Sequence, residues 1–260
     1  MTVPATSSVE SVRVLHLTDP HLFADIDGEF RGTVTYASLV SVLAHYQNSG
    51  WNADIVSVTG DLIQDDSSEA YENFKALFRP LRLPIHCVPG NHDDRTLMSG
   101  ALDAAPFYYC GTAEFDNWLI AGVDSCLNES AGGVISADEL DRLDTAIESS
   151  DAKHVMVCLH HPPVPMGSKW LDTVGLNNGH EFLARIGTSG RVRLAIFGHV
   201  HQAYDKAHDG VQIIGTPSTC RQFKPLSDDF AVDGQPPAYR RLTLHADGSF
   251  DNELVWTRDA

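Results

Sequence analysis

The sequence has few cysteines and no long apolar run. Its five cysteines are scattered over 260 residues without a CxxC pair, a distribution that indicates neither a disulfide framework nor a thiolate zinc site. No apolar run approaches the roughly 18 residues that a membrane span needs. The opening residues, MTVPATSSVE, lack the basic segment and apolar block of a secretory signal. We therefore predict a protein of the reducing cytoplasm with no membrane partner.

Basic residues are also scarce. Lys and Arg number 18 against 35 Asp and Glu, which gives a net charge of −17. Such a chain lacks the positive field that attracts nucleic acid or anionic lipid, so we predict no nucleic-acid partner. An anionic small molecule remains a possible substrate wherever a local positive charge overrules the global field. Histidine, in contrast, occurs 13 times, and many of these residues gather in short segments.

Short β-branched runs alternate with amphipathic segments, which is typical of a layered α/β fold. Strands are predicted at residues 12–17, 54–58, 85–88, 154–159, 192–197, 211–214, 240–244 and 253–256, with one or two more within 115–123. Helices are predicted at 36–48, 68–78, 137–147 and 181–186, with Ser67 or Ser68 capping the second. Residues 162–178 look like a long loop, and the Asp-Gly at 247–248 marks a hairpin. We predict a single domain over residues 1–260, with 1–10 as a flexible tail.

Polar residues gather just beyond the ends of these strands. They are Asp19, His21, Asp61, Asn91, His92, His160, His161, His199 and His201. In layered α/β folds sites are built at that edge, because the strand fixes the backbone while the following loop projects the side chain. The i, i+2 spacing places Asp19 and His21 on one side, and likewise His199 and His201.

This donor set is typical of a metal centre. Carboxylate, imidazole and amide oxygen without thiolate suit Zn, Mn, Fe, Ni or Co. The donors are more than one ion needs, and they suit two ions that share a carboxylate. An isolated Asp-Pro or Gly-Asp is an ordinary turn dipeptide, and a lone histidine is more often structural. Together, the five short segments that carry these donors, each of which follows a predicted strand, favour a metal centre over separate structural roles.

The order DPH, GD, GNHD, HHP and GHVH resembles that of the calcineurin-like metallophosphoesterase superfamily. Within it, the chain is most similar to the bacterial class III cyclic-nucleotide phosphodiesterases, in particular those that act on cyclic AMP. The resemblance runs from about Val12 to Trp256. The finer assignment rests on weaker strings, namely WLD at 170–172, TPSTC at 216–220, QFKP at 222–225 and LHADG at 244–248. The resemblance implies a four-layer α-β-β-α sandwich, with two mixed sheets flanked by helices.

The resemblance also implies roles for the polar residues. Asp19, His21 and His201 would hold a first metal, and Asn91, His160 and His199 a second. Asp61 would bridge the two. The family pattern favours His160 over its neighbour His161 as the ligand, although the sequence allows either. The ions would be two divalent or trivalent metals, Fe, Mn or Zn.

His92 matches the catalytic histidine of the family, which is not a ligand. In the phosphoprotein-phosphatase branch an Asp three residues after the bridging carboxylate pairs with this histidine. Here that position is Gln64, so the pair is missing or replaced from elsewhere. Asp93 or Asp94 is a candidate to orient His92, and Asp65 is another.

The predicted activity is metal-dependent hydrolysis of a cyclic phosphodiester, 3′,5′-cyclic AMP to 5′-AMP. A metal-bridging hydroxide would attack phosphorus in line while His92 assists the leaving oxygen. The alternatives are a broad phosphodiesterase for glycerophosphodiesters, aryl phosphodiesters or nucleotide pyrophosphates, and a non-catalytic scaffold of the same fold. The substrate would be a small-molecule nucleotide, and the enzyme a monomer or homodimer.

Of the other residues with reactive or aromatic side chains, some are predicted to be structural, and for others the sequence leaves two roles open. His16 and His45 are expected to pack in the core or lie on the surface. Trp170 either stacks on a nucleobase or packs within its own loop. Residues 216–220 either line the substrate pocket or form a hairpin corner. Cys220 has no activating partner in the sequence and is not expected to be a nucleophile.

Overall fold

The computed structural model describes residues 2–3 and 11–257, and these form two large mixed sheets packed face to face. One sheet has seven strands in the order β1 (Thr2–Val3), β8 (Thr112–Phe115), β9 (Trp118–Gly122), β10 (His154–Cys158), β11 (Val192–Phe197), β13 (Val211–Gly215) and β12 (Tyr204–His208). The other has six, in the order β17 (Phe250–Trp256), β16 (Ala238–His245), β2 (Ser11–Leu17), β5 (Ile55–Thr59), β6 (Ile85–Val88) and β7 (Phe107–Tyr109).

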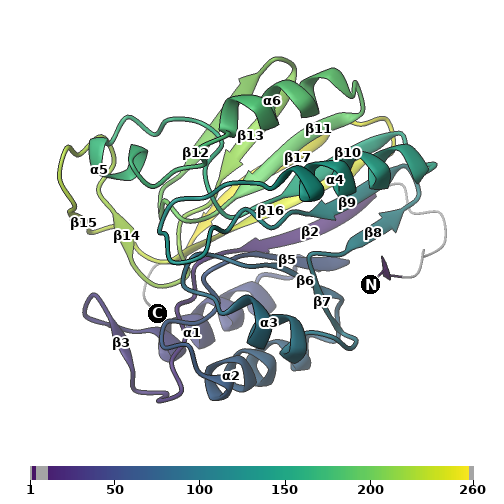
Figure 1. Ribbon diagram of the computed structural model, residues 1–260. Coiled ribbons are helices and arrows are strands. Elements are labelled where there is room, and N and C mark those ends of the chain that lie inside the picture. Colours follow the sequence, from purple (N-terminus) through teal and green to yellow (C-terminus); the bar gives the residue numbers. More distant parts are fainter. Residues whose placement is uncertain (1, 4–10, 258–260) are drawn as a thin grey trace.

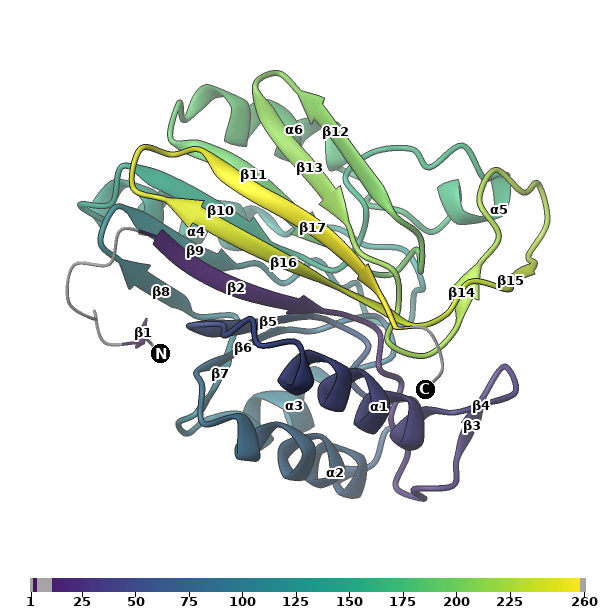
Figure 2. The ribbon, with the colours of Figure 1, turned by 180° about the vertical axis from the view of Figure 1, so that it is seen from behind.

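Helices cover the outer face of each sheet (Figures 1 and 2). The six-stranded sheet carries α1 (Thr35–Asn48), α2 (Ser68–Phe78), the 3₁₀ turn η1 (Arg79–Leu81) and α3 (Arg95–Ala101). The seven-stranded sheet carries α4 (Ala137–Ser149) and α6 (Gly179–Thr188). The predicted four-layer α-β-β-α sandwich is therefore confirmed.

The two-residue period of the strands explains these layers. In β2, Val14 faces the other sheet, whereas Leu15 and Leu17 belong to the core beneath the helices. In β10, Met156 packs between the sheets and Val157 packs toward α4 and α6. Successive side chains of a strand point to opposite faces. A strand buried on both faces therefore reads as a continuous apolar run.

Most predicted elements are confirmed, with boundaries shifted by a few residues. Residues 115–123 contain the end of β8 and all of β9, and Ser67 is the cap of α2, since its side chain accepts from Ala70 N at 3.2 Å. One prediction is wrong: the long loop at 162–178 contains a short helix, α5 (Lys169–Asp172). A single turn is too short to show a helical period in the sequence.

Other elements were missed because they bury little or are only two residues long. Only Met98 of α3 is buried, and β12 is largely exposed, so neither shows an apolar period. Two short ribbons also escaped prediction. One joins β3 (Glu29–Phe30) to β4 (Thr33–Val34), and the other joins β14 (Gln222–Phe223) to β15 (Val232–Asp233).

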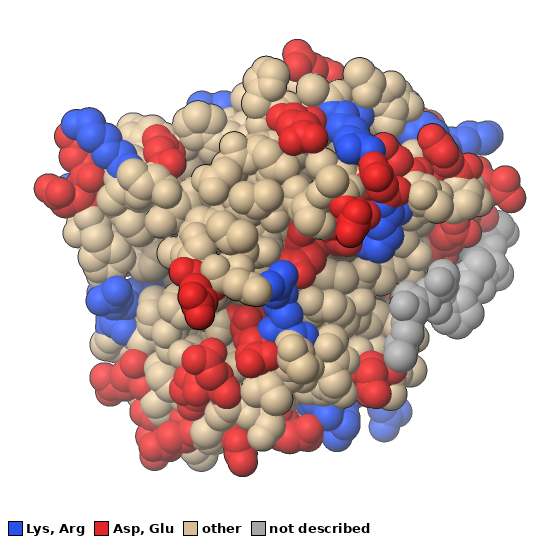
Figure 3. Space-filling view, viewed as in Figure 1, with Lys and Arg blue, Asp and Glu red and all other residues tan. Residues whose placement is uncertain are grey.

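The predicted tail, residues 1–10, lies outside the described residues except for Thr2–Val3, which pair with β8. No helix in the described part of the chain has the length and apolarity to cross a membrane. Figure 3 shows many acidic side chains over the lower part of one face, around α2 and α3, with single Lys and Arg side chains dispersed over the whole face. That face carries no basic stripe of the kind that tracks a nucleic-acid backbone.

Candidate metal centre

Five loops that are far apart in the sequence meet at one edge of the two sheets. They follow β2, β5 and β6 of the six-stranded sheet and β10 and β11 of the seven-stranded sheet. Backbone hydrogen bonds hold the loops together: Asp19 N donates to Gly60 O at 3.1 Å, and His21 N donates to Asp61 O at 3.0 Å. Gly198 N donates to His160 O at 3.1 Å, which joins the two loops of the seven-stranded sheet.

Asp19, His21 and His201 form the first group of donors, and all three are at most 2% exposed. His21 Nε2 lies 3.1 Å from His201 Nε2, and His201 Nε2 lies 3.3 Å from Asp19 Oδ1. The donor atoms of these three residues all lie within 4.8 Å of one another. This is the spacing of atoms that share one ion.

Asn91, His160 and His199 form the second group. His160 Nε2 lies 3.2 Å from Asn91 Oδ1 and 3.2 Å from His199 Nδ1. His160 and His199 are buried, whereas Asn91 is partly exposed at the rim. The second group is therefore the one that opens to solvent.

Asp61 lies between the two groups. Its Oδ1 is 3.4 Å from His160 Nε2, and its Oδ2 is 3.7 Å from His21 Nε2. One carboxylate thus turns one oxygen to each group, as a bridging ligand requires. The bridging role that the family resemblance implies for Asp61 stays a prediction.

The protonation of the histidines leaves lone pairs facing inward. His160 Nδ1 lies 2.8 Å from Thr59 O, and His201 Nδ1 lies against Arg221 O. A carbonyl only accepts, so each Nδ1 carries the proton and donates it. The Nε2 atoms of both rings then face carboxylate, amide or imidazole atoms, where each can bind either a proton or a metal ion. Metal cations fit these clusters of acceptors, whereas neutral side chains alone leave them without partners.

The electrostatics favour positive charge at the same place. Burial acts to lower the pKa of His160, but the carboxylate of Asp61 outweighs it and raises that pKa to about 9. Burial acts to raise the pKa of Asp61, yet His160 and His92 hold it well below its usual value. A site that stabilises an imidazolium beside an ionised carboxylate also suits a bound cation.

The backbone of the site is strained. Positive φ angles occur at non-glycine residues after β2, β5 and β11. They are Asp19 at 51°, His21 at 47°, Asp61 at 50°, His199 at 68° and His201 at 50°. Each such residue costs on the order of 1–3 kcal/mol, and such strain clusters at functional sites. The surrounding hydrogen bonds must therefore hold these side chains in place against a local preference.

Glycine is required where the loops touch. A Cβ on Gly90 would lie 2.8 Å from Asp61 Cγ, and a Cβ on Gly60 would lie 2.7 Å from His160 Cγ. Such contacts are closer than real Cβ atoms show, so a larger residue would displace the donors.

His92 lies beside the donors at the rim. Its candidate ligand atom falls within 4.8 Å of those of His21 and Asp61, but its Nδ1 is occupied by Gln64, whose amide nitrogen is 3.1 Å away. The amide donates, so Nδ1 accepts and the His92 proton sits on Nε2. Gln64, which stands at the position of the family Asp, thus contacts His92 in place of that carboxylate.

None of the three acidic residues considered as a partner of His92 contacts its ring. Asp93 accepts from the backbone nitrogens of Leu62 and Gly90 and from Tyr71, and so ties the loops after β5 and β6 together. The other two serve local turns. Asp94 caps α3 through Thr96 N and Leu97 N, and Asp65 accepts from Ala24 N and Ser67 Oγ.

His161 also lies beside the second group, since its candidate donor atom falls within 4.8 Å of those of His160 and His199. Its Nδ1 pairs with Ser125 Oγ at 2.9 Å, while burial and nearby His199 hold its pKa well below the usual value. His160 in contrast lies 3.4 Å from Asp61. The geometry therefore favours His160 over His161 as the donor.

Aromatic rings wall the first group. Phe30 stacks on His21 at 4.2 Å between ring centroids, and Phe223 stacks on His201 at 4.0 Å. Trp170 packs edge-on against Phe223 and Phe230 at 5.4 and 5.2 Å. The indole thus belongs to a packed cluster within its own region, and its role toward a nucleobase stays a prediction.

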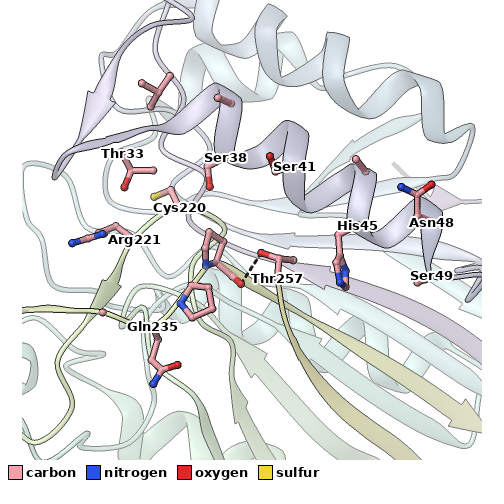
Figure 4. Close-up of a pocket in the computed structure, with 16 residues that line it drawn as sticks. Thr33, Ser38, Ser41, His45, Asn48, Ser49, Cys220, Arg221, Gln235 and Thr257 are labelled. Atoms are coloured by element: carbon pink, nitrogen blue, oxygen red, sulfur yellow. Dashed lines mark hydrogen bonds between the residues drawn. The ribbon is translucent and has the colours of Figure 1, made fainter. Parts of the chain in front are cut away.

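The turn at 216–220 packs behind the first group. Ser218 Oγ donates to Asp19 O at 2.8 Å, and Cys220 Sγ lies 3.5 Å from the same oxygen. Burial raises the pKa of Cys220 to about 12, which leaves it a poor nucleophile. Cys220 also lines a cavity of about 960 Å³ between α1 and residues 234–237 (Figure 4). Among the described residues, none of the candidate donors lines that cavity.

Comparisons with known proteins agree with this arrangement. The family model for calcineurin-like phosphoesterases matches residues 12–203. A protein of Pseudomonas aeruginosa named 3′,5′-cyclic adenosine monophosphate phosphodiesterase CpdA is 35% identical, covering 96% of this chain and 91% of its own length. A Nostoc protein named 3′,5′-cyclic-nucleotide phosphodiesterase is 31% identical, covering 94% of this chain and 91% of its own length.

Solved structures show the same fold at low identity. A dimetal phosphatase from Danio rerio superposes with a TM-score of 0.63 at 17% identity, covering 95% of this chain and 99% of its own. The Plasmodium protein GAP50, described as an anchor in the inner membrane complex, gives 0.66 at 11% identity, covering 96% and 85%. With the family model matched across the five loops, the chain belongs to the calcineurin-like phosphoesterase family.

Proposed function

We propose that this protein is a metal-dependent phosphodiesterase that hydrolyses a 3′,5′-cyclic nucleotide, cyclic AMP to 5′-AMP. One observation supports the choice of substrate: relatives named for cyclic AMP or cyclic-nucleotide hydrolysis match at 31 to 35% identity over more than nine-tenths of this chain. The donor cluster at the meeting point of the loops supports the metal dependence.

In this proposal Asp19, His21 and His201 hold a first ion, and Asn91, His160 and His199 hold a second. Asp61 would be shared, because its two oxygens face the two groups at 3.4 and 3.7 Å. When bound, a pair of divalent ions neutralises phosphate charge and makes water a nucleophile near neutral pH. The imidazole and carboxylate donors accept Fe, Mn or Zn alike.

His92 would serve the leaving oxygen. Gln64 occupies its Nδ1, so the proton on Nε2 is available for donation toward a substrate above the rim. Its partly exposed position next to Asn91 lets it reach a ligand that the buried donors cannot. For cyclic AMP, the 3′ oxygen would take that proton as it departs, leaving 5′-AMP.

Three further features of the proposal follow from the sequence. The enzyme would act in the cytoplasm, as a monomer or homodimer, on a small-molecule nucleotide. A broad phosphodiesterase and a non-catalytic scaffold are the alternatives. The names of the relatives do not favour either one.

A substrate panel tests the proposal. Protein stripped of metal and reloaded with Mn, Fe or Zn is assayed on cyclic AMP, 2′,3′-cyclic AMP, bis(p-nitrophenyl) phosphate and p-nitrophenyl phosphate. We expect kcat/KM to be highest for cyclic AMP and activity to vanish without metal. If cyclic AMP is hydrolysed no faster than the aryl esters, the broad phosphodiesterase is supported. If the protein takes up no metal and hydrolyses none of the substrates, the non-catalytic scaffold is supported.

A further inference from the structure

A chain of hydrogen bonds runs from the turn after β13 to the carboxylate of Asp19. Thr216 Oγ1 lies 2.8 Å from His16 Nδ1, and His16 Nε2 lies 2.8 Å from Thr59 Oγ1. Thr59 Oγ1 lies 2.8 Å from Thr18 Oγ1, which lies 2.6 Å from Asp19 Oδ2. The side chains that form this series of hydrogen bonds are fully buried.

The charge of Asp19 fixes the direction of every bond. A carboxylate only accepts, so the 2.6 Å contact requires the Thr18 proton. Thr18 Oγ1 also lies 3.0 Å from the backbone oxygen of Thr59, so its proton is not available to the Thr59 hydroxyl, and Thr59 Oγ1 must donate to Thr18. Because the Thr59 hydroxyl donates its only proton to Thr18, its oxygen accepts the hydrogen bond from His16 Nε2–H.

The far end of the chain follows by the same reasoning. A neutral imidazole with its proton on Nε2 presents Nδ1 as an acceptor, and Thr216 donates to it. Burial, with the charge of Arg240, lowers the pKa of His16 to about 3, which keeps this ring neutral. All four donors therefore point toward Asp19.

The chain also determines which oxygen of Asp19 is free. Thr18 occupies Oδ2, while Oδ1 lies 3.3 Å from His201 Nε2 and faces the first group. Gly198 leaves room for this contact, since a Cβ there would lie 2.7 Å from Asp19 Oδ2. His199 N donates to both carboxylate oxygens and does not distinguish them.

The series of hydrogen bonds connects the two sheets. Thr216 follows β13 of the seven-stranded sheet, whereas His16 lies in β2 of the six-stranded sheet. The position of Asp19 thus depends on how the two sheets pack, and not only on its own loop.

We propose that Thr18, Thr59, His16 and Thr216 form a positioning relay that holds Asp19 with Oδ1 toward the first ion and stabilises its negative charge. The inference rests on the assignment of Asp19 to the first ion in the proposed function. It gives His16 a role that its place in a buried strand does not suggest. Partners of metal ligands typically change metal affinity by about 10- to 100-fold when removed.

The test is made on the whole protein with Mn²⁺ alone. Calorimetry measures the two affinities, and anomalous diffraction at limiting Mn²⁺ measures the occupancy at each position. Thr18→Val removes the proton donor without changing the shape of the side chain, and Thr18→Ser restores the hydroxyl. We expect Thr18→Val to weaken the first ion by about 10- to 100-fold, with the second ion nearly unchanged and Thr18→Ser close to wild type.

A second variant acts at the far end of the relay. Thr216→Val leaves Thr18 in place, and we expect it to weaken the first ion by a few-fold, less than Thr18→Val. The matched control is His86→Phe. His86 is another fully buried histidine, which contacts Gly111 O and, among residues 11–257, has no hydrogen bond leading to a donor of the centre. This control should bind both ions as wild type does.

The outcomes separate the two proposals. If wild type holds no ion between Asp19, His21 and His201, the proposed metal centre fails. If wild type holds two ions and Thr18→Val binds the first one equally well, the relay is wrong. If Thr18→Val does not fold, unchanged affinity in Thr216→Val would overturn the relay, as would a loss equally large in His86→Phe.

Discussion

The two groups of donors differ in what surrounds them. Asp19, His21 and His201 are buried, backed by hydroxyl groups and covered by the rings of Phe30 and Phe223. The second group is supported less: Asn91 is partly exposed, and its side-chain oxygen contacts only His160 among the described residues. Buried, supported donors hold an ion tightly, while the open side is where a substrate and His92 can meet.

The largest effect should come from the residue that the two groups share. Asp61→Asn removes the charge that faces both His160 and His21, so we expect both ions to weaken and turnover to fall by more than about 10⁴-fold. Elemental analysis after dialysis, together with kcat on cyclic AMP, measures this. Loss of only one ion would show that Asp61 belongs to a single group.

Replacing His92 should separate chemistry from metal binding. His92→Ala removes the proton donor at the rim but no donor of either group, so turnover of cyclic AMP should fall by roughly 10²- to 10⁴-fold with both ions retained. A substrate with a good leaving group should lose much less. If the ions are lost as well, His92 is a ligand.

Replacing Asn91 should distinguish the groups directly. Asn91→Ala removes one oxygen from the open side, so the second ion should weaken by about 10- to 100-fold while the first stays bound. Titration with Mn²⁺ followed by calorimetry gives both affinities. Equal retention of both ions, with full activity, would remove Asn91 from the site.

Replacing Gln64, which lies beside His92 at the open side of the centre, should have a smaller effect on turnover. Gln64→Leu removes the one hydrogen bond to His92 Nδ1, so kcat should fall by about tenfold, the worth of a hydrogen bond near 1.4 kcal/mol. Metal content should not change. Activity equal to wild type would leave His92 without a positioning partner in Gln64.

The smallest effect concerns His86, a buried histidine of β6. Burial is the main cause that lowers the pKa of His86, to about 4. Protonation therefore favours the unfolded chain, and stability is lost as the pH falls from about 6.5 toward 4. In protein without metal we expect this contribution to reach about 1 kcal/mol at pH 5.5.

Chemical denaturation at pH 7.5 and 5.5 measures it, with His86→Phe as the comparison because phenylalanine cannot be protonated. The variant should lose about 1 kcal/mol less than wild type between these two pH values. An identical loss in both proteins would mean that His86 does not titrate in this range.

Much of the fold and the candidate site could be predicted from the sequence. Buried strands appear as short apolar runs, and Asp19, Asp61 and His160 each follow one directly. Because the ends of neighbouring strands meet at one sheet edge, these residues come together without any knowledge of the loops. His199 and His201 also reach the centre, but their left-handed backbone beyond the end of β11 directs them there, and not the alternation of a strand.

The remainder depended on contacts between distant segments. Gln64 reaches His92 across two loops, and Phe30 stacks on His21 from a short ribbon with no apolar period. His16 and Thr216 are 200 positions apart and belong to different sheets. A single sequence carries no signal for such pairs. A histidine in a buried strand that needs two polar partners was the one available hint.

The central claim is that the five loops hold two cations on either side of Asp61. Anomalous diffraction from crystals grown with Mn²⁺ tests it directly. The account predicts one peak among Asp19, His21 and His201 and another among Asn91, His160 and His199, each touching one oxygen of Asp61. A single peak, or peaks away from Asp61, would contradict it.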